Sequence, residues 1–111
     1  MWKANDAAAL AGRALPVFRR NRGRALSRER LCRILDCNDR KLRMAVRELR
    51  CRGHLIVADP DGGYRFAEEG QEVYGYTATL KSRIQALREV TDAMEQAARQ
   101  EFGAARQLEL M

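Results

Sequence analysis

The fold is decided by residues 27–53, which read SRERLCRILDCNDRKLRMAVRELRCRG. At the start of this stretch, Ser27 has the small polar side chain that accepts a hydrogen bond from the first turn of a helix. Leu31, Ile34 and Leu35 then recur at a helical spacing, with arginines between them. The pattern predicts a short helix over residues 28–35 that packs by its Leu31, Ile34 and Leu35 face.

A second helix is expected after a turn of about three residues. Asn38 or Asp39 can cap its first turn, and Gly53 stands where a left-handed residue ends a helix. Its apolar residues recur at intervals of four and three, at Leu42, Val46 and Leu49. Two short helices joined by a tight turn, the second of them strongly basic, form the helix-turn-helix pattern.

The periodicity changes after the second helix. Residues 54–58 form a short β-type run, residues 59–63 (DPDGG) are dense in turn-forming residues, and residues 64–66 form a second β-type run. We therefore expect a β-hairpin directly after the helix-turn-helix, which makes the whole a winged helix.

A helix also precedes the deciding stretch. Asn5 or Asp6 can cap it, and its apolar spacing reaches Phe18. Because the ring of Pro16 removes a backbone donor and crowds the preceding turn, this residue either kinks the helix or starts a second short one.

The C-terminal third of the sequence predicts one long helix. Residues 70–100 contain no proline, and apolar or small residues recur at intervals of four and three from Val73 to Ala98. Such a helix would extend about 45 Å, which is longer than a small domain can cover. Part of this stripe is therefore expected to pair with a second copy of the chain, and folding back on the domain is the alternative. The candidate dimerisation residues are Leu80, Ile84, Leu87, Thr91 and Met94.

These elements predict a mainly α protein with a small β-hairpin (α+β), built as a winged helix-turn-helix followed by a long C-terminal helix. Residues 1–68 are expected to form the winged domain, residues 69–103 the long helix, and residues 104–111 a frayed tail, because Phe102 and Gly103 should end the helix.

The charges are divided unevenly along the chain. Residues 13–52 contain 14 arginines and lysines against 4 acidic residues, and 13 of these 14 cations are arginines. Residues 53–111 contain 6 basic and 10 acidic residues. A dense cationic segment favours binding of a polyanion, and arginine suits both phosphate oxygens and guanine edges.

The order of these motifs resembles the winged helix-turn-helix superfamily. The resemblance is carried by LSRERL (26–31), by DRKLR (39–43) with AVREL (45–49), and by the later GGY (62–64). With Tyr74, Leu80 and Arg83 added, the chain is similar to small winged-helix proteins common in prophages and phage genomes. The resemblance implies a DNA-binding protein of transcription control, or of phage replication or recombination. Its recognition helix, about residues 38–52, would enter the major groove.

Within that arrangement, the N-terminal turns of the second helix would contact base edges, and the start of the first helix would contact phosphates. The candidate DNA-binding residues are Ser27, Arg28, Arg30, Asn38, Arg40, Lys41, Arg43, Arg47 and Arg65. The hairpin turn contains Asp59 and Asp61 and has only Arg65 as a nearby cation, so the wing is expected to contribute little to DNA affinity. This acidic turn also favours the alternative, a protein–protein interaction module.

The three cysteines predict reduced thiols rather than disulfides, because their number is odd and the chain lacks export features. Cys51 and His54 have the spacer of a zinc-ligand pair, but the Cys32 to Cys37 spacing is too loose for the second pair. We therefore expect no metal site.

The sequence does not support a membrane protein or an enzyme. The longest apolar stretch, residues 7–11, is far shorter than the ~20 residues of a membrane span. No motif pairs a nucleophile with a base, and no glycine-rich phosphate loop is present. We expect a cytoplasmic protein of a bacterial or phage-infected cell, without catalytic residues, cofactor or small-molecule ligand, whose partners are double-stranded DNA and a second copy of itself.

Overall fold

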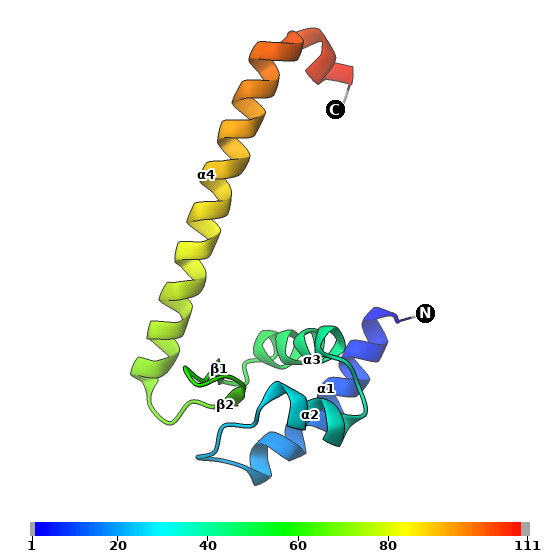
Figure 1. Cartoon of the computed structure of the whole chain (residues 1–111), viewed down its shortest axis with the longest axis vertical. Coiled ribbons are helices and arrows are strands. Elements are labelled where there is room, and N and C mark those ends of the chain that lie inside the picture. The colour runs from blue at the N-terminus through cyan, green and yellow to red at the C-terminus, as the bar shows by residue number, and fades with distance from the viewer. Residues whose placement is uncertain (1, 110–111) are drawn as a thin grey trace. The chain divides into compact units, whose positions relative to one another are not determined.

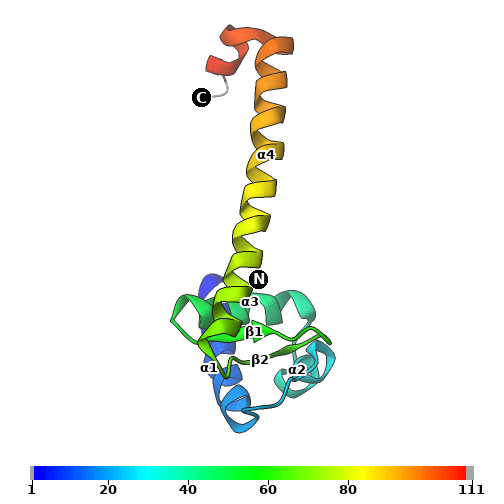
Figure 2. The ribbon, with the colours of Figure 1, turned by 90° about the vertical axis from the view of Figure 1, so that its left-hand side faces the viewer.

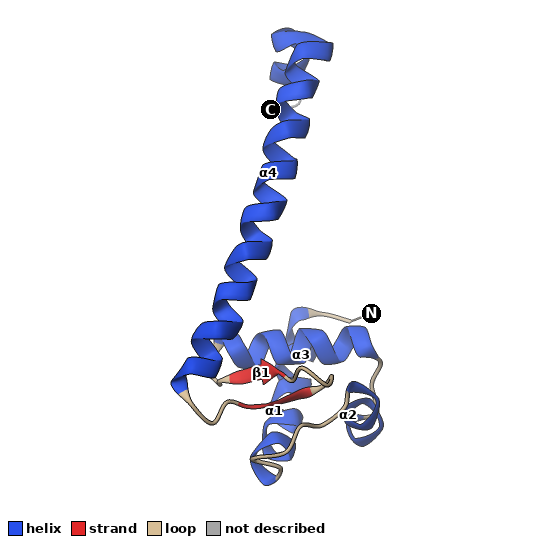
Figure 3. Cartoon of the chain, turned by 60° about the vertical axis from the view of Figure 1, so that its left-hand side comes forward, coloured by secondary structure: helices blue, strands red, loops and turns tan. Residues whose placement is uncertain are grey.

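The computed structural model describes residues 2–109, without the side chains of residue 4 and residues 104–109 (Figure 1). The element order is α1 (Ala4–Arg20), α2 (Arg28–Leu35), α3 (Asp39–Cys51), β1 (Ile56–Ala58), β2 (Tyr64–Phe66) and α4 (Gly70–Glu109). The protein is thus mainly helical with one small hairpin, which confirms the expected α+β class (Figure 3). Contacts divide the chain into two compact units, one reaching Tyr76 and the other beginning at Thr77.

Helix α1 is a single helix that contains Pro16, so the alternative in which Pro16 starts a second helix is wrong. The helix begins earlier than expected, after Lys3, whose backbone N–H donates to Asp6 Oδ2 over 2.6 Å. Asp6 therefore stabilises the first turn from inside the helix rather than as its cap. Gly23 lies in the turn after α1 with φ of 79°.

The caps of α2 and α3 agree with the sequence. Ser27 Oγ accepts from the backbone N–H of Arg30 over 3.1 Å, and Asn38 Oδ1 accepts from that of Lys41 over 2.9 Å. Between the helices Asp36 adopts the left-handed conformation with φ of 51°, which ends α2 sharply. Both N-termini are thus capped by a side chain, and a three-residue turn (36–38) joins the C-terminus of α2 to the N-terminus of α3.

The core of the first unit lies between α1, α2, α3 and the hairpin. Leu31, Leu42, Val46 and Leu49 are its largest fully buried side chains. Ile34 was expected on this face but is 48% exposed. Its position is ~100° around the helix from Leu35, beyond the narrow edge by which so short a helix contacts α3.

The hairpin lies beside α1 and α3 (Figure 2). Its strands are antiparallel, with Ile56 opposite Phe66, and Leu26 extends the ladder by an antiparallel bridge to Tyr64. The first strand is shorter than the predicted run 54–58, because the His54 N–H bonds back to Leu49 O at the end of α3. Gly63 packs so closely on Leu26 that a Cβ there would lie 2.2 Å from Leu26 O.

Helix α4 is longer than predicted. The backbone breaks at Gly103, which has φ of 77° and ψ of 169°, but helix resumes and continues to Glu109. The break coincides with the end of the long helix expected at Phe102 and Gly103, and residues 104–109, expected as a tail, are a stretch rich in good helix formers (AARQLE) with a helical backbone. The rest of that prediction, residues 110–111, lies outside the described residues. Among the described residues, no helix is both long and apolar enough to cross a membrane.

Candidate nucleic-acid interface

The solvent-exposed face of α3 carries three arginines, Arg40, Arg43 and Arg47. They are spaced by three and four residues, so they lie in one row along the helix. At ~100° per residue the centre of this row is about 125° around the helix from the centre of the buried row of Leu42, Val46 and Leu49. The same helix thus fixes its position by one face and presents cations by the other. We call Arg40, Arg43 and Arg47 the arginine row.

One carboxylate forms ion pairs near the N-terminal end of the arginine row. Asp39, the first residue of α3, forms an ion pair with Arg43, with 2.9 Å between Oδ2 and Arg43 Nη2, and a second with Arg28 at the start of α2, with 3.7 Å between Oδ1 and Arg28 Nε. It joins the two helix N-termini and holds Arg43 along the helix. No ion pair partners Arg40 or Arg47 within the described part of the chain. The arginine row therefore keeps a net positive charge.

The start of α2 adds further exposed groups. Ser27, Arg28 and Arg30 are all exposed, as is Asn38 in the turn. The side-chain oxygens of Ser27 and Asn38 already accept hydrogen bonds from their own helices. In the structure these two side chains therefore act as helix caps. The remaining free backbone N–H groups at the start of each helix form a position at which an anion can bind.

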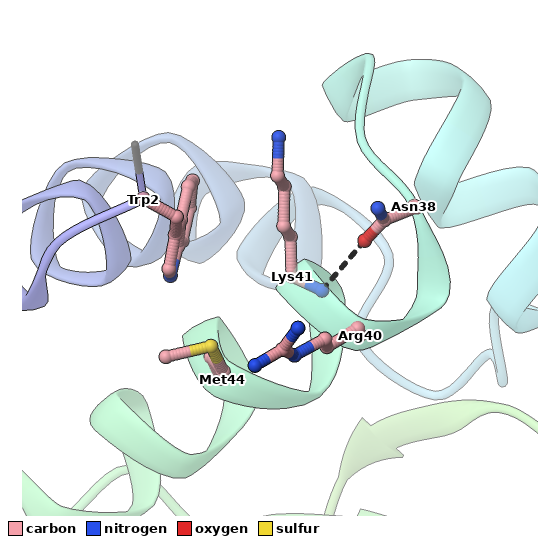
Figure 4. A pocket seen from close by; sticks show the side chains of 5 residues that line it. All are labelled: Trp2, Asn38, Arg40, Lys41 and Met44. Atoms are coloured by element: carbon pink, nitrogen blue, oxygen red, sulfur yellow. Dashed lines mark hydrogen bonds between the residues drawn. The ribbon is translucent and has the colours of Figure 1, made fainter.

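Lys41 lies apart from the arginine row, over the indole of Trp2. Its Nζ is 5.1 Å from the ring centroid. These two residues line a hollow of about 440 Å³ together with Asn38, Arg40 and Met44 (Figure 4). In the close-up the Lys41 side chain extends alongside the indole, and the side chains of Arg40 and Met44 lie below them. The N-terminal segment of the chain thus borders the first turns of α3.

Several arginines of the basic segment serve the fold instead. Arg13 donates to Leu35 O at the end of α2, and Arg22 stacks on Phe66 with its guanidinium carbon 4.6 Å from the ring centroid. Arg50 donates to Ile56 O over 2.8 Å and lies over the rings of Tyr64 and Tyr76. Their positions show that charge counting overstates the cations available to a polyanion.

Arg65 was predicted as a DNA contact, but its guanidinium is paired with two carboxylates within the fold. Its side chain is only 17% exposed and is held between Asp59, at 3.1 Å, and Glu72, at 2.6 Å. The hydrogen bonds that the Arg65 guanidinium donates to Glu72 and Asp59 raise the pKa of Arg65. Reciprocally, the hydrogen bond from Arg65 lowers the pKa of Glu72 to about 2. Arg65 connects the hairpin to the first turn of α4 and is not placed as a DNA contact.

The hairpin turn is acidic in the structure as in the sequence. Asp59 is neutralised by Arg65, but Asp61 is exposed. The Asp61 backbone N–H donates to Asp59 Oδ2 over 3.0 Å, so the turn is organised around the Asp59 carboxylate. No cation at this turn points outward to reach a phosphate, in the residues described.

The cysteines do not gather into a ligand set. All three are free thiols, and no cluster of three or more potential metal ligands occurs among residues 2–109. Cys32 and Cys37 adjoin each other at the end of α2, where the Cys37 N–H donates to Cys32 O over 3.0 Å. Burial and the neighbouring Cys32 thiol raise the pKa of Cys37 to about 11.

Of the predicted site residues, the structure brings together those of α2, the turn and α3, and separates Arg65 from them. Sequence reasoning missed Trp2 and Asp39. The Asp39–Arg43 spacing of four residues was a usable signal for an ion pair. Nothing in the sequence placed Trp2 beside Lys41. Comparison with protein-family models, curated proteins and solved structures found no match.

Proposed function

We propose that this chain is a cytoplasmic, sequence-specific double-stranded DNA-binding protein with a winged helix-turn-helix domain. It would serve in transcription control or in phage replication or recombination. The order α2, three-residue turn, α3 and hairpin supports the winged assignment. In this proposal α3 is the recognition helix and enters the major groove.

The observation that carries the proposal is the arginine row on the solvent-exposed face of α3. A helix in the major groove contacts bases by its N-terminal turns, where Arg40 and Arg43 lie. Unpaired guanidinium groups can bind O6 and N7 of guanine with two hydrogen bonds, or can bind phosphates. Arg40 and Arg47 have this freedom, whereas Arg43 must exchange its ion pair with Asp39 for a contact to DNA.

The supporting contacts come from α2. The exposed Arg28 and Arg30 flank the α2 N-terminus, a position from which cations and backbone donors set the register on the phosphate backbone. The hairpin contributes little in this proposal, because Arg65 is held by two carboxylates and Asp61 would face the DNA with a negative charge.

The second candidate function is a protein–protein interaction module. The acidic hairpin turn favours it, together with two exposed apolar side chains of the same unit, Ile34 at 48% and Leu55 at 54% exposure. A partner that used these groups would bind independently of the arginine row.

Charge reversal separates the two functions. Arg40→Glu with Arg47→Glu should lower affinity for duplex DNA by at least ~100-fold, since each good base contact provides ~1–3 kcal/mol. The matched control is a variant with two reversed charges in the second unit, at Arg83 and Arg99, which should bind within a few fold of the natural chain. Equal losses in both variants would show that only net charge matters, and no loss in either would favour the interaction module.

A further inference from the structure

The second unit exposes an apolar row along α4. Ile84 is 59% exposed, Leu87 68%, Val90 57% and Met94 68%. A helix gains most of its stability by covering such a face, so a partner for this row is required.

The polar groups of α4 are arranged as in a helix that buries this row. The hydroxyl of Thr91, which interrupts the row, donates to Leu87 O over 2.8 Å. The Thr91 hydroxyl therefore donates its hydrogen bond within its own helix, and burying Thr91 would leave no donor unpaired. On the outer face Gln85 donates to Glu89 over 3.3 Å. The helix therefore has one face suited to burial and one suited to solvent.

We propose that α4 pairs with α4 of a second copy of this chain, and that the two helices run antiparallel around a centre near Glu89. The pairing stands on residues of the second unit and does not depend on DNA binding.

A parallel pair is disfavoured by its charges. With Ile84 and Thr91 at the first core position of the heptad and Leu87 and Met94 at the fourth, Arg83 and Arg88 flank the core. In a parallel pair each Arg83 would face the partner's Arg88. Two arginine pairs would therefore lie close together, one on each side of the apolar seam. No flanking pair of opposite charge compensates, because Val90 and not an ionisable residue stands opposite the partner's Glu95.

An antiparallel pair turns the same residues into a complementary set. The residues that directly follow a fourth core position, Lys81, Arg88 and Glu95, then face one another across the seam. Each Lys81 therefore meets the partner's Glu95. Arg88 faces the partner's Arg88 once, at the centre, against two such attractive pairs. Val90 meets the partner's Val90 and extends the apolar seam.

Side-chain sizes also match in this orientation. The core layers pair Leu80 with the partner's Ala98, and Leu87 with the partner's Thr91, so large side chains lie opposite small ones. Ile84 and the partner's Met94 fill the layer between these two. In the parallel pair, by contrast, Ala98 and Thr91 would each face themselves and leave two thin layers.

The antiparallel register fixes one distance that bears on the proposed function. At ~1.5 Å per residue, the two copies of Thr77, where the second unit begins, lie about 36 Å apart along the helix axis. One turn of B-DNA is ~34–36 Å. If DNA binding holds, the attachment points of the two recognition units are separated by about one turn of the duplex.

Cysteine pairing tests the orientation in the full chain without DNA. The background carries Cys51→Ser, since Cys51 is the exposed native thiol, and this background alone must stay uncrosslinked. Leu80→Cys in a tagged copy is mixed with Ala98→Cys in an untagged copy under glutathione redox buffer. The two variants should form a disulfide-linked heterodimer on a non-reducing gel, and neither should form a homodimer.

Each other outcome overturns the proposal. Homodimers of Leu80→Cys and of Ala98→Cys would indicate a parallel pair, because the same residue faces itself there. Disulfides of every kind would show that the register is not fixed, and a dimer without any disulfide would show a different register. A monomeric mass of the natural chain by analytical ultracentrifugation at ~100 µM would exclude pairing. None of these results depends on whether the arginine row binds DNA.

Discussion

The first unit of the Gly63→Ala variant should unfold at a lower denaturant concentration than that of the Gly62→Ala variant. Both glycines have positive φ, 85° and 100°, so either alanine carries the strain of a conformation that L-residues avoid, about 1–2 kcal/mol. Only Gly63 has a backbone neighbour, because its added Cβ would lie 2.2 Å from Leu26 O, whereas nothing lies within 4 Å at Gly62.

The extra cost at Gly63 follows from the bonds that must yield. Relief of the clash moves the hairpin away from Leu26 and breaks the two bonds of its bridge to Tyr64, each 2.9 Å long. Each such bond contributes about 0.5–1.5 kcal/mol, so Gly63→Ala should be destabilised by about 1–3 kcal/mol more than Gly62→Ala.

Urea unfolding followed by Trp2 fluorescence measures this difference. Trp2 is the single tryptophan and belongs to the first unit, so the signal does not report on the second. Equal unfolding free energies for the two variants, within ~0.5 kcal/mol, would refute the close packing of the hairpin on Leu26.

Three further predictions concern the same unit. Glu72 has a pKa of about 2 instead of 4.5 because of Arg65, so its stabilisation is complete above pH ~4.5 and is lost as pH falls toward 2. The natural chain should lose stability in this window more steeply than Glu72→Gln, as acid titration with circular dichroism would show. Cys51 is exposed while the pKa of Cys37 is raised to about 11, so iodoacetamide at pH 8 should label Cys51 first in a mass-spectrometric time course. Arg50→Ala should lower the unfolding free energy by about 2 kcal/mol, since it removes one hydrogen bond and two ring contacts, and should reduce DNA affinity far less than Arg47→Ala.

The local elements were predictable from the sequence because their signals are local. Ser27 and Asn38 cap the helices that they precede, and the Leu42, Val46 and Leu49 row is buried as its spacing predicted. These features depend on neighbours within one or two helical turns, which a single sequence displays.

The errors arose where the outcome depends on packing between elements. Arg65 looked like a free cation because its partner Glu72 belongs to another element, which only the fold brings within 2.6 Å. Ile34 has a helical spacing but lies beyond the edge that α3 covers. The position of Trp2 beside Lys41 depends on how α1 packs against α3, and no periodicity encodes it.

The central claim is that the arginine row of α3 binds duplex DNA, and salt-dependent binding tests it most directly. Fluorescence anisotropy of a labelled mixed-sequence duplex would be measured against protein concentration from about 50 to 200 mM salt. The affinity should fall steeply, with a slope of ~0.9 per phosphate contacted and several phosphates in total, and Arg47→Ala should reduce the affinity. Absence of binding at 50 mM salt, or binding that neither salt nor Arg47→Ala weakens, would contradict the account.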